Sequence, residues 1–324
     1  MNLKDFSKPI KKDLEQFNTY FKELLNTKVP LLNFILKYIT QKKGKQLRPM
    51  LVMLSAGMCG GINQRSYTGA AMMELLHTAT LVHDDVVDEA SERRGLASIN
   101  AKWNNKIAVL VGDYLLSKGL IISIDANEFL FLGATSKAVR RMSEGELLAI
   151  DKSRDFIIDE DIYFKIISDK TASLMAACCR IGAISATENT EIHDKLELYG
   201  EYAGIAFQIK DDILDYTSSS FLIGKPVGND LKEKKITLPL IYALSKIDSK
   251  EAEKIVKRIK KGKLTKQEIE NYIQLAKDNG GIEYAEAKAN EFINKAKAIL
   301  QDFPDNESKN ALIEFTDFVL QRSN

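Results

Sequence analysis

The sequence predicts an all-α protein, and three observations support this fold class. Apolar residues recur at steps of three and four along most of the 324 residues, which is the spacing of one helix face. The chain contains 6 prolines and 18 glycines, too few for an architecture built on strands and turns. Strict apolar–polar alternation, the period of a strand, never persists for more than a few residues. We therefore expect one domain of many helices spanning residues 1–324.

The expected helices follow one another along the chain. An amphipathic helix fits the N-terminus, MNLKDFSKPIKKDLEQF, which lacks the apolar region of a secretory signal. Apolar stripes of helical period then cover 30–40, 47–60, 70–90, 106–124, 133–150, 160–186 and 192–216. The last third is more charged, and 251–277 and 283–303 are typical of helices with one solvated face. Breaks fall at 42–49, 91–98 and 217–230.

Composition excludes several classes of protein. The formal net charge is +1, so no global field favours nucleic acid as a partner. The cysteines, Cys59, Cys178 and Cys179, are odd in number and two are adjacent, which indicates reduced thiols in a cytoplasmic protein. The longest apolar runs, such as TASLMAACC at 171–179, are shorter than the roughly 18 residues that span a bilayer.

The stretch LVHDDVVDEA, residues 81–90, places three aspartates beside apolar residues. On a helix, Asp84 and Asp88 lie one turn apart on the same face, and Asp85 lies about 100° round. Like charges at this spacing repel, and the repulsion grows with burial. The cluster therefore favours a bound cation. Carboxylates with few other ligands suit Mg²⁺, which keeps its waters and a substrate phosphate.

A second aspartate cluster has the same spacing. Asp211, Asp212 and Asp215 in FQIKDDILD also follow an apolar helical run. A single cluster could be a solvated acidic helix end, but two on separate apolar helices are hard to explain as surface charge. If the helices face each other, the clusters could grip several divalent ions. Such ions would hold a polyanion, most simply a diphosphate.

Basic residues adjoin the clusters or the loop breaks. Arginine binds phosphate oxygens with two parallel donors, whereas lysine acts as a point charge. Each basic residue alone would fit a solvated surface, so its position is what suggests a phosphate. His77 lies two turns before Asp84 on nearly the same face and is either a phosphate donor or a satisfied core histidine. The basic candidates are Lys45, Arg48, Arg93, Arg94, Lys170, Lys225 and Lys235.

These motifs resemble those of the trans-isoprenyl diphosphate synthases, also called polyprenyl synthetases. The resemblance extends over nearly the whole chain, and the matching segments are HDDVVD with ERRG, FQIKDDILD, KGKQLRP, GDYLLSKG, KTASL, GKPVGNDL and KITLP. The chain departs from the family pattern at two loop positions, Lys43 and Lys234, where a glycine is usual. The departures bear on local loop geometry and leave the aspartate motifs intact.

The resemblance implies a fold and a reaction. The fold is a single bundle of long helices around a deep central cavity, the isoprenoid synthase type, usually in a homodimer. In the reaction an allylic diphosphate ionises, and isopentenyl diphosphate attacks the cation head-to-tail. Loss of a proton, thought to go to the departing diphosphate, leaves a new trans double bond. Membrane contact would be at most peripheral, for product release.

The resemblance also implies residue roles. The Mg²⁺ ligands would be Asp84, Asp88 and Asp211, with Asp85, Asp212 and Asp215 as further ligands or support. The allylic diphosphate would be bound by Arg93, Lys170, Thr171, Gln208, Lys225 and Lys235. Isopentenyl diphosphate would be bound by Lys45, Arg48, His77 and Arg94. Fixed positive charge around the leaving diphosphate would lower the barrier to ionisation.

Product length would be set on the helix below Asp84. Short-chain members often place an aromatic residue at one of two positions, which here are Ala79 and Thr80, both small. ELLHTATLVHDDVVD is therefore most like octaprenyl and heptaprenyl synthases, which make quinone side chains of about C30 to C40. Alternatively, the small residues permit close helix packing, and Met73 or Leu76 sets a shorter floor.

Other functions stay open at this point. One is a short-chain farnesyl or geranylgeranyl diphosphate synthase, and another is the non-catalytic subunit of a heteromeric prenyl synthase. A terpene cyclase normally has a different second metal motif, and a non-catalytic subunit typically loses one aspartate motif. A purely structural helical protein would not need six aspartates at these positions.

Overall fold

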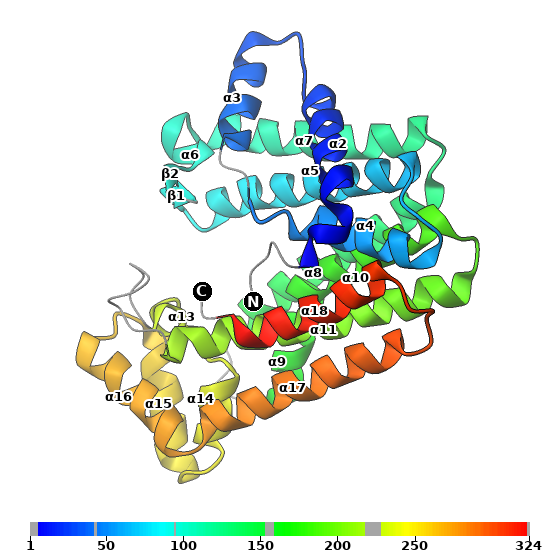
Figure 1. Cartoon of the computed structure of the whole chain (residues 1–324). Helices are drawn as coiled ribbons and strands as arrows, with labels where there is room; N and C mark the ends of the chain where they lie inside the picture. The colour runs from blue at the N-terminus through cyan, green and yellow to red at the C-terminus, as the bar shows by residue number, and fades with distance from the viewer. Residues whose placement is uncertain (1–5, 42–43, 94, 153–158, 218–227, 323–324) are drawn as a thin grey trace.

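We analysed a computed structural model, which describes residues 6–41, 44–93, 95–152, 159–217 and 228–322. Across these residues the chain is helical apart from one short hairpin, which confirms the all-α prediction (Figure 1). The first elements are η1 (Lys8–Ile10), α2 (Lys11–Leu24), α3 (Pro30–Thr40), α4 (Leu47–Cys59), α5 (Gln64–Val87), β1 (Glu92–Arg93), β2 (Leu96–Ala97), α6 (Ile99–Lys102) and α7 (Asn105–Asp125). They are followed by α8 (Phe129–Lys152), α9 (Glu160–Ile167), the π-helical turn η2 (Ser168–Ala172), α10 (Ser173–Ala186) and α11 (Thr190–Thr217). The C-terminal elements are α13 (Asn229–Lys232), α14 (Leu238–Leu244), α15 (Ser249–Lys261), α16 (Lys266–Asp278), α17 (Gly281–Leu300) and α18 (Glu307–Gln321).

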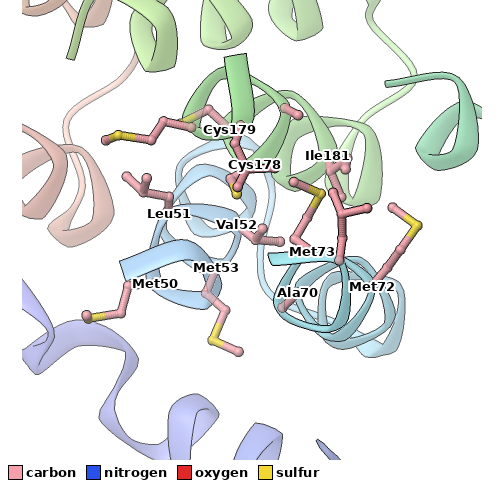
Figure 2. Packing of buried hydrophobic residues seen from close by; sticks show 14 of the residues in the cluster. Met50, Leu51, Val52, Met53, Ala70, Met72, Met73, Cys178, Cys179 and Ile181 are labelled. Atoms are coloured by element: carbon pink, nitrogen blue, oxygen red, sulfur yellow. The ribbon is translucent and has the colours of Figure 1, made fainter. Parts of the chain in front are cut away.

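Long helices pack side by side around one large apolar core. Helix α5 lies along α7, and α10 packs against α4, α8 and α11. Helix α17 runs along α11, whereas α13 to α16 gather at one end of the molecule (Figure 1). Figure 2 shows part of the core, where Leu51 and Val52 of α4 lie on the side of Cys178 and Cys179 of α10, and Met73 of α5 lies near Ile181. Burial raises the pKa of the Cys179 thiol to about 12, so it packs as a neutral apolar group.

The periodicity predicted most helices closely, and the differences have local causes. Helix α5 begins at Gln64 rather than at residue 70, because the Asn63 side chain caps it and Ser66 bonds back to the Asn63 N–H. The predicted segment 251–277 is two helices, separated at Gly262, which has φ +75°. The break at 91–98 contains the antiparallel hairpin of β1 and β2, whose strands are too short to show alternation.

Helix α7 is long and apolar enough to cross a membrane by length and composition alone. One third of its most apolar window is buried in the structure, and the helix packs along α5. Core helices of soluble proteins meet the same criterion. Several large apolar side chains of α7 remain exposed, and they bear on the assembly proposed below.

Helix α10 approaches α4 closely at Gly182. A Cβ atom at this position would lie 2.7 Å from the Ser55 Cβ and closer still to the Val52 carbonyl oxygen. Backbone cannot move aside as a side chain can. The glycine therefore sets the distance between these two core helices.

We predict that Gly182→Ala lowers the free energy of unfolding by about 1–3 kcal/mol, because the added methyl group overpacks the contact between α4 and α10. Gly133→Ala on α8 is a matched control, since a Cβ there meets nothing within 4 Å. The control should raise the free energy of unfolding by about 0.4–1 kcal/mol through helix propensity. Urea denaturation at one protein concentration measures both, and equal effects would contradict the close approach.

Candidate active site

The first aspartate cluster forms the C-terminal end of α5. Asp84 and Asp88 are both exposed on one face, and the Asp88 N–H bonds to the Asp84 carbonyl oxygen at 2.8 Å. Partial burial is the main cause that raises the pKa of Asp84, and the Asp88 charge adds to it. A helix C-terminus already carries partial negative charge, so carboxylates here are unfavourable without a cation. The C-terminal end of α5 therefore favours the binding of a cation.

Asp85 points in a different direction from its neighbours. It is buried, and Arg93 Nε in β1 donates to its Oδ1 at 2.6 Å. Burial raises the pKa of Asp85, although the Arg93 charge opposes the shift. The Asn100 side chain also donates to the Asp85 carbonyl oxygen. Asp85 therefore links the hairpin to α5. Its side chain lies on a different face of the helix from those of Asp84 and Asp88.

A cavity of about 140 Å³ adjoins this pair. Among its lining residues are Glu74, Thr78, Leu81 and Asp85, a stripe of α5 about 100° from the Asp84 face. The other walls come from α2, α3, the segment before α4, and the hairpin. Asp84, Asp88, Thr80 and Met73 are not among its lining residues, and the deep central cavity implied by the family resemblance stays a prediction.

The second aspartate cluster lies on α11, and its three members have different surroundings. Asp211 is exposed at 45% of its side chain, and Arg322 donates to its Oδ1 at 2.7 Å. Asp212 is buried; Tyr163 Oη donates to one oxygen at 2.7 Å and Gln208 Nε2 to the other at 2.8 Å.

Asp215 caps a neighbouring helix. Its two oxygens accept the backbone N–H groups of Asn229 and Asp230, each at 3.0 Å, at the start of α13. Asp230 was not singled out in the sequence, although it lies in GKPVGNDL. Burial and the Asp215 charge raise its pKa to about 6. Asp230 thus belongs to the acidic site, but its motif has no repeated spacing to reveal it.

Two lysines link the clusters electrostatically. The Lys170 charge acts on Asp84 and also on Glu233. Burial alone would lower the pKa of Lys235, but Glu233, Asp230 and Asp88 outweigh it and raise that pKa. Asp88 is on α5 and Asp230 is next to α11, so both clusters border the same space. In this state Lys170 pairs with Glu146, and Lys235 pairs with Glu233 at 2.6 Å.

Thr171 and Gln208, both predicted to lie near the allylic substrate, contact each other directly. Thr171 Oγ1 donates to Gln208 Oε1 at 2.9 Å, and Gln208 in turn holds Asp212. A hydrogen-bonded chain therefore runs from η2 through α11 to Tyr163 on α9. Tyr163, Glu146 and Arg322 had no signal in the sequence, because their partners are distant along the chain.

The remaining predicted residues are less tightly assembled. Lys45 is exposed, and Arg48 and His77 are half-buried at the start of α4 and on α5. Gln46 between them has φ +51°, a strained conformation for a non-glycine residue that turns the chain into α4. Arg94 and Lys225 lie outside the described residues, so their predicted roles have no structural counterpart here.

The acidic side chains suit a metal ion whose coordination shell the protein alone does not complete. Within the described ranges, no group of three His, Cys, Asp or Glu side chains is close enough to hold a metal ion. Mg²⁺ typically takes one or two carboxylates and completes its shell with waters and substrate phosphate. Asp84, Asp88 and Asp211 are exposed carboxylates suited to that role, and Asp211 would share it with its partner Arg322. Both oxygens of Asp212 and of Asp215 accept hydrogen bonds within the protein.

Comparison with known proteins gives a consistent family. A model of the polyprenyl synthetase family matches residues 29–276. The chain is 36% identical to octaprenyl diphosphate synthase of Escherichia coli (strain K12) over 99% of both chains. It is 35% identical to all-trans-nonaprenyl-diphosphate synthase (geranyl-diphosphate specific) of Rhodobacter capsulatus, over 98% of this chain and 97% of that one. It is 34% identical to heptaprenyl diphosphate synthase component 2 of Bacillus subtilis (strain 168), over 96% and 88%.

Solved structures of similar shape carry related names. A decaprenyl diphosphate synthase from Rhodobacter capsulatus superposes with a TM-score of 0.92 at 32% identity, covering 100% of both chains. A polyprenyl synthase from Caulobacter crescentus, complexed with calcium and isoprenyl diphosphate, gives 0.91 at 32% identity, covering 100% and 98%. A geranylgeranyl pyrophosphate synthase from Bacteroides thetaiotaomicron gives 0.84 at 38% identity, covering 98% of both.

We predict that Asp212 makes the metal-free protein less stable as pH rises. Burial raises its pKa from 3.8 to about 8, so between these values the folded state holds a proton that the unfolded state has lost. The free energy of unfolding should fall with pH in this window, by at most about 1.4 kcal/mol per pH unit for this group.

Asp212→Asn removes the titration and should flatten that slope. Urea denaturation in EDTA at several pH values between about 5 and 8 measures it. Asp302→Asn, at an exposed ion pair with Lys195, is the control and should keep the wild-type slope. An Asp212→Asn slope equal to that of the wild type would contradict the prediction.

Proposed function

The chain belongs to the polyprenyl synthetase family, and we propose that it is a Mg²⁺-dependent synthase of long-chain all-trans polyprenyl diphosphates. It would condense isopentenyl diphosphate head-to-tail with an allylic diphosphate primer, to a product of about C30 to C40. The observation that carries this proposal is the pair of aspartate clusters on α5 and α11, with Lys170 acting on Asp84, and Lys235 acting on Asp88 and on Asp230, the neighbour of the second cluster. The long-chain names of the most similar relatives support the product class.

The charges of the site suit loss of a diphosphate. As the allylic C–O bond breaks, negative charge accumulates on the leaving group, and preorganised cations there lower the barrier. Lys170 and Lys235 would exchange their present partners, Glu146 and Glu233, for diphosphate oxygens. Asp84, Asp88 and Asp211 would hold Mg²⁺, whose bound ions would supply further positive charge to the leaving group. Lys45, Arg48 and His77 would orient the second substrate.

One assay separates the candidate functions. The purified chain is incubated with Mg²⁺, labelled isopentenyl diphosphate and an allylic primer, and product lengths are measured. We expect prenyl diphosphates longer than C20. A cyclase would give hydrocarbon, and a non-catalytic subunit alone would give nothing. The latter alternative has a specific basis, because the Bacillus subtilis relative is named as one component of a synthase.

We predict that Asp84→Ala and Asp211→Ala each lower turnover by about a hundredfold or more, because each removes a metal-binding charge that balances the leaving diphosphate. EDTA should abolish turnover of the wild type. Asp302→Ala removes an exposed carboxylate elsewhere and should leave turnover unchanged. Helical content by circular dichroism should be the same in all variants. Near-normal turnover in either cluster variant would refute the two-cluster mechanism.

The two positions proposed to set product length, Ala79 and Thr80, lie on different faces of α5. Thr80 is one turn below Asp84 on the same face, and Met73 lies about 16 Å below Asp84 on that face. Met73 is fully buried and contacts Thr135 of α8, so it lies at the buried end of the α5 face that carries Asp84 and Thr80. Ala79 instead shares a stripe with Leu75 and His83, which lie against glycines of α7. This orientation favours helix packing as the reason for a small residue at 79.

We predict that Thr80→Phe shortens the product toward C15 to C20 while ionisation of the primer continues. Ala79→Tyr must displace α7, so it should lower the thermal midpoint by several degrees as well as alter product length. Product chromatography and thermal denaturation measure the two effects. A wild-type product of C20 or less would show that Met73 or Leu76 sets the floor.

We further propose that the protein is a cytoplasmic homodimer, as the family resemblance implies. Cys59, Cys178 and Cys179 are free thiols, which supports a reducing compartment. Helices α7 and α8 expose large apolar side chains that a second copy would cover. They are Val109, Leu110, Leu120, Ile121 and Ile124 on α7, and Phe129 and Leu130 at the start of α8.

We predict that the double variant Leu110→Glu/Ile121→Glu is monomeric, because two buried charges would oppose an apolar interface. Size-exclusion chromatography with light scattering should give the mass of two chains for the wild type and one for the variant. Leu198→Glu, an exposed leucine on α11, is the control and should remain dimeric. A variant that keeps the mass of two chains would exclude this face.

A further inference from the structure

The turn that carries Lys170 and Thr171 has an unusual backbone. Residues Glu160–Ala186 run as one helical segment, interrupted by the π-helical turn η2 at Ser168–Ala172. Such turns insert an extra residue and occur mostly at functional sites. Here Lys170 faces Glu146, Thr171 faces Gln208, and Asp169 is buried at 5% exposure. A π turn is less regular than an α-helix, so surrounding contacts must specify its shape.

A network of charges around the buried Asp169 holds the turn from behind. Arg141 of α8 donates from Nε to Asp169 Oδ1 at 2.7 Å and from Nη2 to Ser168 Oγ at 2.8 Å. Its two terminal nitrogens also bind both oxygens of Glu201 on α11, at 2.7 and 3.2 Å. Lys165 completes the network by donating to the other oxygen of Asp169 at 2.7 Å. One guanidinium thereby fixes η2 against two helices.

The charges of this network are mutually balanced. Burial by itself would raise the pKa of Asp169, but Lys165 and Arg141 outweigh it and lower that pKa. Burial acts in the same sense on Glu201, and the bonds from Arg141 and Ser168 again lower its pKa. Both carboxylates are therefore ionised at neutral pH and bind Arg141 at full charge. Charge-assisted bonds of this kind are roughly twice as strong as neutral ones.

The η2 turn also packs closely against helix α8. A Cβ atom at Gly145 would lie 2.9 Å from the Asp169 Cβ and 3.1 Å from the Lys170 nitrogen, so η2 rests directly on α8. The next residue, Glu146, pairs with the Lys170 ammonium group. A single rigid helix thus supplies Arg141 behind the turn, a glycine beneath it, and the partner of its lysine.

We propose that Arg141, Asp169 and Glu201 are positioning residues for the allylic diphosphate. They fix the π turn so that the Lys170 ammonium and the Thr171 hydroxyl meet the diphosphate in a set geometry. This proposal rests on the proposed prenyl transfer, and it adds three residues that determine how the site binds the allylic substrate. Since a shift of about 1 Å can cost a hundredfold in rate, indirect support of this kind has a measurable effect.

The test uses the full-length protein, three single variants of the network, one double variant and one control variant. Arg141→Met removes the network, Asp169→Asn removes one charge with little change of shape, and Arg141→Lys keeps the charge without the planar fork. Arg180→Met is the matched control, because Arg180 also bridges two carboxylates, Asp194 and Glu197, but not at the turn. Binding of a thiolo-diphosphate analogue of the primer, with Mg²⁺ present, is measured by calorimetry, and KM is measured for each substrate.

We expect Arg141→Met and Asp169→Asn to weaken analogue binding and raise the KM for the primer by about tenfold or more. The KM for isopentenyl diphosphate should change less than twofold, which a general loss of folding would not produce. Arg141→Lys should resemble Arg141→Met, and the double variant Arg141→Met/Asp169→Asn should be no worse than the worse single variant. Arg180→Met should match the wild type in both KM values.

The outcomes are distinguishable. A wild type that neither condenses the substrates nor binds the analogue would refute the proposed function, and this inference with it. An active wild type whose Arg141 and Asp169 variants behave like Arg180→Met would refute the inference alone. Equal losses for both substrates would also refute it, because they would indicate a merely structural role. Should Arg141→Met fail to fold, Asp169→Asn decides by the same criteria.

Discussion

Repulsion between carboxylates at the ends of α5 and α11 is the constraint on which the rest of the site depends. Asp84, Asp88, Asp211 and Asp230 border one space beside an apolar core, where charge is poorly screened. Nearby cations and the exposure of several of these carboxylates to solvent reduce the repulsion. A metal and a polyanion would complete the same balance during turnover. Without a ligand, this repulsion lowers the stability of the folded protein, as is typical of charges that are grouped at a functional site.

Two motifs with the same letters have different structures. In the α5 motif the first and last aspartates are exposed, and the second binds Arg93. In the α11 motif the first pairs with Arg322, the second is enclosed by Tyr163 and Gln208, and the third caps α13. Spacing places carboxylates on a helix face, but the neighbouring elements decide which oxygens are available.

The sequence predicted the helices well because their signal is local. Pro30–Thr40 was bounded correctly, since a stripe at steps of three and four needs no distant partner. The aspartates were singled out by their repeated spacing, and Lys170 and Gln208 by the resemblance of their segments to those of the family. The π turn, the hairpin pairing and the roles of Arg141 and Arg322 were not predicted, because each depends on side chains far apart in the chain. Asp85 and Asp212 were expected as metal ligands or as support for the ligands, and only tertiary contacts show which side chains bind their oxygens.

The contact between Arg322 and α11 has a consequence for biosynthesis. Arg322 stacks on the Phe207 ring at 3.7 Å and donates to the Phe207 carbonyl oxygen, and these two residues are separated by 115 positions. While a ribosome is still translating the intervening residues, α11 has left the exit tunnel without this cation. Asp211 therefore lacks the charge of Arg322 until the segment around residue 322 has left the ribosome, so this part of the acidic site is completed late in synthesis.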